Sequence, residues 1–106
     1  MLKKDLNDLE ENGVIGDWCF LETKETPSRL LMFLRYPIRE DDAKLGDWWP
    51  LSDSKTKGHI VSLPLSGDKG PVWKWDGNQE TPTISPSINV IGHWHGFIEN
   101  GILRTI

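Results

Sequence analysis

Hydrophobic positions in this sequence form one short helical stripe followed by a series of strand-length runs. Leu2, Leu6 and Leu9 are spaced four and three residues apart, which predicts a helix over residues 2–12. Apolar runs of strand length then follow at 17–22, 29–36, 59–65, 72–75, 83–91, 94–98 and 102–106. Glycine and proline separate most of these runs. The pattern predicts a mainly β (α+β) fold, a small antiparallel β roll or sandwich with one short N-terminal helix and a C-terminal β-hairpin.

The C-terminal hairpin is centred on Asn100-Gly101, the dipeptide favoured in two-residue type I′ turns. Such a turn sets Glu99 opposite Ile102 and, further along, His95 opposite Ile106. One face of the hairpin, with the pattern of a core face, then carries Trp94, Gly96, Ile98, Leu103 and Thr105. The other face carries His93, His95, Phe97, Glu99, Ile102, Arg104 and Ile106, and so holds most of the reactive side chains.

The stretch 37–58 has no regular pattern and is expected to be a long loop within a single domain that spans residues 1–106. Loops of this kind often carry function. This loop combines a charged rim with an aromatic anchor, as protein-binding surfaces do. The candidate partner-binding residues are Glu40, Asp41, Asp42, Trp48 and Trp49.

The net charge and the cysteine content limit the kinds of partner and the cellular location that we expect. The chain has 106 residues, with 12 Lys and Arg against 16 Asp and Glu, so its formal charge of −4 makes nucleic acid an unexpected partner. The single cysteine, Cys19, excludes an intramolecular disulfide, favours a cytoplasmic location and, in an apolar run, is expected to be buried and inert. No apolar run approaches the roughly 20 residues that cross a membrane.

Two histidines form a candidate metal site. His93 and His95 lie on one side of a strand, about 7 Å apart at Cα, a spacing that two ligands of one zinc ion can use. His59 and Glu99 are candidates for the remaining ligands, with Glu99 also a candidate general base. The alternative is that both histidines are half-exposed strand residues that pack beside Phe97, and the lack of a spacing-defined partner favours it.

Trp73 and Trp75 share one face of a strand and form a candidate aromatic platform, which could stack sugars or bases or anchor a protein partner. The alternative is that these indoles fill the core of a small β domain.

Two serines lie in the proline-rich segment 81–88, Ser85 and Ser87. Neither a Gly-x-Ser-x-Gly elbow nor a Ser-x-x-Lys motif surrounds them. We therefore interpret both as structural hydroxyls and predict no catalytic residue.

Three motifs occur in order: W-K-W-D-G-N at 73–78, T-P-T-I-S-P-S-I at 81–88, and H-W-H-G-F-I-E-N-G-I-L at 93–103. Over residues 59–106 the chain resembles a domain-of-unknown-function family of small bacterial, prophage and phage proteins, some of which carry the automatic label ammonia monooxygenase. The resemblance implies a structural zinc site with early cysteines, but the matching strand at 31–37 has none. Only His93 and His95, with His59 as a third candidate, fit the implied ligand set.

Together these features favour a non-enzymatic function. The leading hypothesis is a small acidic phage-type accessory protein in the bacterial cytoplasm, which binds a host protein and inhibits a defence component. The second is a zinc-binding protein or metal-dependent hydrolase built on the His-x-His strand. A weaker third is a carbohydrate-binding module.

Overall fold

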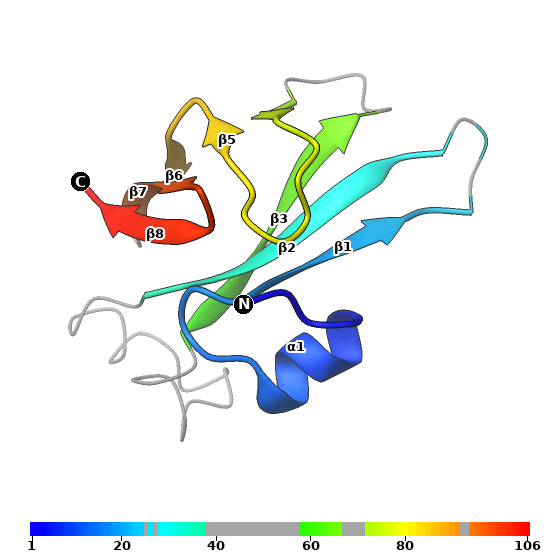
Figure 1. Ribbon diagram of the computed structural model, residues 1–106, viewed down its shortest axis with the longest axis horizontal. Helices are drawn as coiled ribbons and strands as arrows, with labels where there is room; N and C mark the ends of the chain where they lie inside the picture. Colours follow the sequence, from blue (N-terminus) through cyan, green and yellow to red (C-terminus); the bar gives the residue numbers. More distant parts are fainter. Residues whose placement is uncertain (25, 27, 38–57, 67–71, 92–93) are drawn as a thin grey trace.

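The computed structural model describes residues 1–24, 26, 28–37, 58–66, 72–91 and 94–106 (Figure 1). Within these residues the chain forms one short helix and eight strands. They are α1 (Leu6–Asn12), β1 (Trp18–Glu22), β2 (Leu30–Tyr36), β3 (His59–Ser66), β4 (Lys74–Trp75), β5 (Ile84–Ser85), β6 (Ile88–Val90), β7 (Trp94–Glu99) and β8 (Ile102–Thr105). The strands form three antiparallel sheets with the orders β1-β2-β3, β4-β5 and β6-β7-β8. The mainly β fold with a short N-terminal helix and a C-terminal hairpin is confirmed.

Helix α1 starts four residues later than the leucine spacing predicted. Asp5 caps it, since its side chain accepts a hydrogen bond from the Asp8 N–H at 2.8 Å. Leu2 instead forms an isolated parallel bridge with Trp18, and the Lys3 N–H donates to the Trp18 carbonyl at 2.7 Å. The predicted start was wrong because Leu2 pairs with Trp18 of β1 and does not belong to the apolar face of the helix.

A buried arginine anchors α1 to the first sheet. Arg35 of β2 is buried, and its guanidinium donates to the carbonyls of Leu9, Glu10 and Gly58 at 2.9, 2.8 and 3.1 Å. Carbonyls at the end of a helix lack partners within the helix, so a guanidinium satisfies them well. The end of α1 and the start of β3 are thereby held to the same strand.

The predicted strand over residues 83–91 is divided in two. β5 ends at Ser85 and pairs with β4, whereas β6 begins at Ile88 and pairs with β7. Pro86 lies between them, and proline has no N–H for a continuous ladder. The chain therefore changes sheets within this segment, and Ser87 lies directly before β6 (Figure 1).

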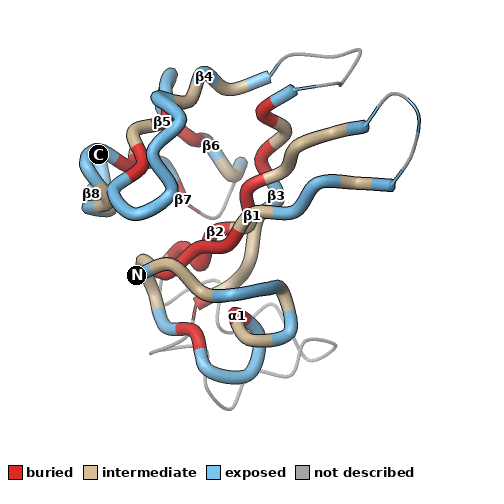
Figure 2. Tube along the Cα trace, turned by 45° about the vertical axis from the view of Figure 1, so that its right-hand side comes forward, coloured by how far each residue is buried: buried red, intermediate tan, exposed pale blue. Residues whose placement is uncertain are grey.

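The hydrophobic core joins all three sheets (Figure 2). Its buried members are Trp18, Met32, Leu34, Tyr36, Leu63, Leu65, Ile84, Ile88, Trp94 and Ile98. The Tyr36 and Trp94 rings, from the first and third sheets, stack with centroids 6.1 Å apart. The Trp18 indole donates to the Gln79 carbonyl at 2.9 Å and so links the first sheet to the turn after β4.

The hairpin faces are those that the turn predicted. Trp94, Gly96 and Ile98 are buried, whereas His95 and Glu99 are exposed. The register pairs Glu99 with Ile102, Ile98 with Leu103 and Phe97 with Arg104, as expected. Among the described helical residues there is no segment long and apolar enough to span a bilayer.

Candidate functional site

A serine and a histidine meet on the exposed face of the third sheet. The Ser87 Oγ lies 3.0 Å from the His95 Nε2, within hydrogen-bonding distance. Both side chains are exposed. Elsewhere in the described chain, the ring of His95 has no further hydrogen-bond partner. A serine hydroxyl is therefore paired with an imidazole at a surface that a substrate can reach.

Strand pairing explains why these two residues meet. Asn89 of β6 lies directly opposite His95 of β7. Ser87 precedes Asn89 by two residues, so it projects from the same face and is a diagonal cross-strand neighbour of His95. The pair depends on the β6–β7 register, because a slip of one residue would turn His95 to the other face.

The arrangement has the geometry of a nucleophile and a general base. A serine hydroxyl is a weak nucleophile until a neighbouring base takes its proton, and imidazole is the usual base. When the imidazole proton is on Nδ1, the Ser87 hydroxyl donates its hydrogen bond to Nε2. Ser85 differs from Ser87, since it lies in β5 opposite Lys74 and has no hydrogen bond to a histidine among the described residues.

The candidate zinc ligands do not come together in the part of the chain that the structure describes. His59 lies at the start of β3, where its Nδ1 is 3.5 Å from the Tyr36 hydroxyl. His95 and Glu99 lie on β7, and His93 falls outside the described residues. No group of three His, Cys, Asp or Glu side chains there could hold a metal ion.

The candidate aromatic platform is packed against the protein. Trp75 stacks on Phe20 with ring centroids 4.7 Å apart, and its indole donates to the Asn78 carbonyl at 3.2 Å. Trp73 is half-buried, and both indoles pack against the core cluster. Both indoles are thus only partly buried, at the margin of the core and not inside it.

The candidate partner-binding loop falls outside the described residues, apart from its ends at Pro37 and Gly58. The same applies to the residues assigned to it, namely Glu40, Asp41, Asp42, Trp48 and Trp49.

The comparison with known families identifies the group to which this chain is related. A family model described as bacterial ubiquitination-like system serine protease (BubE) matches residues 22–106. The chain belongs to the BubE family. The match includes both Ser87 and His95. No curated protein and no solved structure matches the chain.

BubE membership corrects the leading functional hypothesis. The family description names a serine protease of a bacterial ubiquitination-like system. The predictions of a phage-type accessory protein that inhibits a host defence component, of a zinc protein or metal-dependent hydrolase, and of a carbohydrate-binding module were therefore wrong. A family of small bacterial domains remains the correct part of the resemblance, and the BubE match gives no support to a phage origin.

Ser87 was interpreted as a structural hydroxyl because no known serine motif surrounds it along the chain. The Ser87–His95 pair is instead formed by residues of two different segments, brought together by the pairing of β6 with β7. The usable signal was the short connection between β6 and β7. Placing a hairpin there puts Asn89 opposite His95 and brings Ser87 to the histidine face.

Proposed function

We propose that this BubE protein is a serine protease in which Ser87 is the nucleophile and His95 is the general base. The observation that carries the proposal is the 3.0 Å contact between the Ser87 Oγ and the His95 Nε2. The family match supports it independently, because the BubE description names serine protease chemistry. A hydroxyl and an imidazole in contact are what that chemistry requires.

The proposed reaction has two stages. In the first, the Ser87 Oγ attacks the carbonyl carbon of an amide while the His95 Nε2 takes the hydroxyl proton. His95 then gives this proton to the departing amine nitrogen as the C–N bond breaks, which leaves an ester on Ser87. In the second, His95 takes a proton from water, and the resulting hydroxide equivalent attacks the ester. His95 then returns this proton to the Ser87 Oγ as the ester C–O bond breaks, and the carboxylic acid product leaves and loses its own proton to solvent.

The proposed substrate is an amide bond at the C terminus of a ubiquitin-like modifier, either in a precursor or in a conjugate. A ubiquitination-like system joins the carboxyl group of a modifier to an amine, so a protease of that system acts on the bond formed. The exposure of Ser87 and His95 supports this substrate class, since an amide carried between two folded proteins can reach only an open site. Other proteins of such a system are the expected partners.

Labelling with a fluorophosphonate tests the nucleophile without knowledge of the substrate. We expect one adduct on the wild-type protein, at Ser87, formed as the Oγ–phosphorus bond replaces the phosphorus–fluorine bond. Ser87→Ala should abolish the adduct, and His95→Ala should slow its formation by about 10³-fold or more because the base is lost. Intact-protein and peptide mass spectrometry would measure it.

Ser85→Ala is the matched control, since it removes a neighbouring exposed hydroxyl that has no histidine contact. This variant should label like the wild type. An adduct at Ser85, or labelling of Ser87 at an unchanged rate in His95→Ala, would contradict the proposed roles.

A further inference from the structure

The strand that begins directly after Ser87 lies at the edge of its sheet. The third sheet has the order β6-β7-β8, so in the described chain β6 is paired on one side only. An edge strand offers backbone N–H and C=O groups to which another extended chain can bind. Such groups beside a nucleophile provide a place to hold a peptide.

The hydrogen bonds of β7 show which backbone groups of β6 are available. The His95 carbonyl accepts from the Ile106 N–H at 3.0 Å, so it points toward the chain end after β8. In an antiparallel strand the N–H and C=O of one residue point to the same side, and this side alternates between residues. The backbone N–H and C=O of His95 therefore point toward β8 and away from β6. The opposite residue, Asn89, consequently makes no backbone hydrogen bond to β7, and its N–H and C=O point to the unpaired edge of β6. No group of the described residues is hydrogen-bonded to them.

The distance along the strand suits a substrate. Ser87 and Asn89 are two residues apart, about 7 Å in an extended chain. A peptide residue paired with Asn89 would place a carbonyl two residues further on near the Ser87 Oγ. Directly after the other end of β6, Ile91 is 86% exposed and offers an apolar contact to the same peptide. A backbone site and the nucleophile are therefore in line along one edge.

We infer that the substrate segment binds as an added strand on β6, hydrogen-bonded to the Asn89 backbone with its scissile carbonyl at Ser87. This inference rests on the proposed function and names how the same site holds its substrate. Because strand addition reads the backbone, it selects an extended, unstructured segment. The occupant is therefore the flexible C-terminal tail of the modifier and not its folded body.

A pair of substitutions at Asn89 separates its backbone from its side chain. Asn89→Pro removes the outward N–H, and an edge position whose N–H faces solvent tolerates proline. Asn89→Ala removes the side chain and keeps the N–H. With the modifier of the same system fused through its C terminus to a reporter protein, we expect kcat/KM for the proline variant to fall about tenfold below the alanine variant. Fluorophosphonate labelling of Ser87 should be equal in the two, since that small reagent does not need the strand.

A kcat/KM of the Asn89→Pro variant within twofold of that of the Asn89→Ala variant would overturn the inference, as would equal large losses of kcat/KM in both variants.

A second measurement uses the unaltered protein and synthetic peptides that span the cleaved bond. Each peptide carries one backbone N-methyl group, which removes a single N–H. Losses of about tenfold at alternate positions are expected, and uniform rates across the series would overturn the strand. If the wild-type Ser87 is neither labelled nor required for cleavage, the proposed function fails first, and the two failures are thus distinguished.

Discussion

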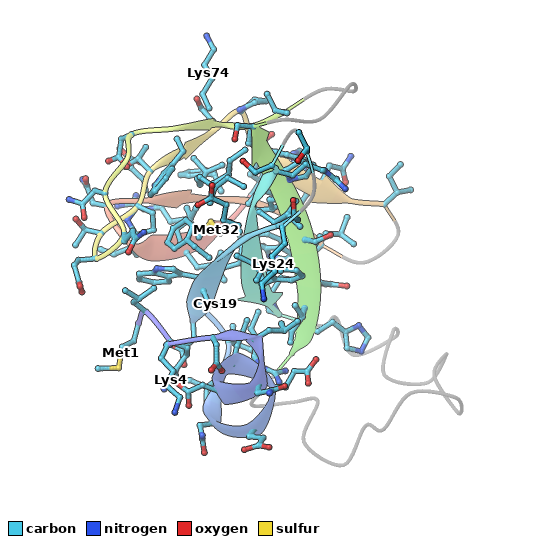
Figure 3. All side chains as sticks on the ribbon, turned by 90° about the vertical axis from the view of Figure 1, so that its right-hand side faces the viewer. Met1, Lys4, Cys19, Lys24, Met32 and Lys74 are labelled. Atoms are coloured by element: carbon cyan, nitrogen blue, oxygen red, sulfur yellow. The ribbon has the colours of Figure 1, made fainter. Side chains whose placement is uncertain are left out.

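At the scale of single residues, burial separates the reactivity of two potential nucleophiles. Cys19 is fully buried, close to where β1 passes α1 (Figure 3), whereas Ser87 is exposed beside an imidazole. Burial raises the pKa of the Cys19 thiol to about 11, and Asp5 and Asp8 add to the shift. Its thiolate form is therefore scarce at neutral pH. The inert thiol expected from the sequence agrees with this position.

Cys19 should resist modification in the native protein. Because a thiol reacts through its thiolate, we expect a disulfide exchange reagent at pH 8 to react with native Cys19 far more slowly than with the urea-unfolded chain. Absorbance of the released reagent would measure both rates. Prompt stoichiometric reaction of the native protein would contradict the assigned burial.

The same thiol predicts a pH dependence with a definite sign. The unfolded thiol loses its proton near its ordinary pKa of 9.0, whereas the native thiol keeps it until about 11. Between these values the native state binds more protons than the unfolded state, so its stability falls as pH rises through this window. In Cys19→Ala this contribution to the decrease should be missing, as urea titrations at several pH values would show.

At the scale of elements, the β7–β8 hairpin depends on a glycine with positive φ. Asn100 and Gly101 have φ values of 49° and 75°, as a type I′ turn requires. A Cβ added to Gly101 would lie 3.2 Å from the Thr81 Cα and 3.3 Å from the Trp18 Cη2. The Gly101 N–H also donates to the Pro82 carbonyl at 2.9 Å, so the turn is held against the segment before β5.

Gly101→Ala should therefore destabilise the protein by about 1–2 kcal/mol, the usual cost of a left-handed backbone for a residue with a Cβ. Urea unfolding followed by circular dichroism would measure the change. Asn100→Gly is the matched control and should differ little from wild type, because glycine adopts the same turn freely. Equal midpoints for Gly101→Ala and wild type would contradict the assigned turn.

The elements that the sequence predicted well are those fixed by local chemistry. Asn100-Gly101 set both the hairpin register and its buried face, because two residues determine the turn. The helix start was misplaced because Leu2 contacts β1, a tertiary effect that leucine spacing does not contain. The Ser87–His95 contact was missed for a related reason. The contact forms because the chain leaves the second sheet after Ser85 and then pairs β6 with β7 in the third sheet. This pairing brings Ser87, from the proline-rich segment, next to His95.

At the scale of the whole molecule, the proposed site shares its support with the core. Ser87 and His95 lie on the exposed face of the third sheet, and Ile88 of β6 and Trp94 of β7 lie on its opposite, buried face. Both belong to the core cluster that contains Leu34 and Tyr36 of β2. The Trp94 indole also donates to the Thr105 Oγ1 at 2.9 Å, which ties β7 to β8. The pairing of β6 with β7, and therefore the Ser87–His95 distance, depends on packing against the first sheet.

This shared core predicts that residues 1–106 unfold as one cooperative unit. Far-UV circular dichroism reports the strands, tryptophan fluorescence reports the core, and fluorophosphonate labelling of Ser87 reports the site. Because neither the first nor the third sheet can expose its face without exposing the other, we expect the three signals to change at the same urea concentration. Ser87 labelling that disappears at lower urea than the other two signals would contradict this expectation. It would show that β6 and β7 separate from the first sheet on their own, and that the site is a locally unstable part of the fold.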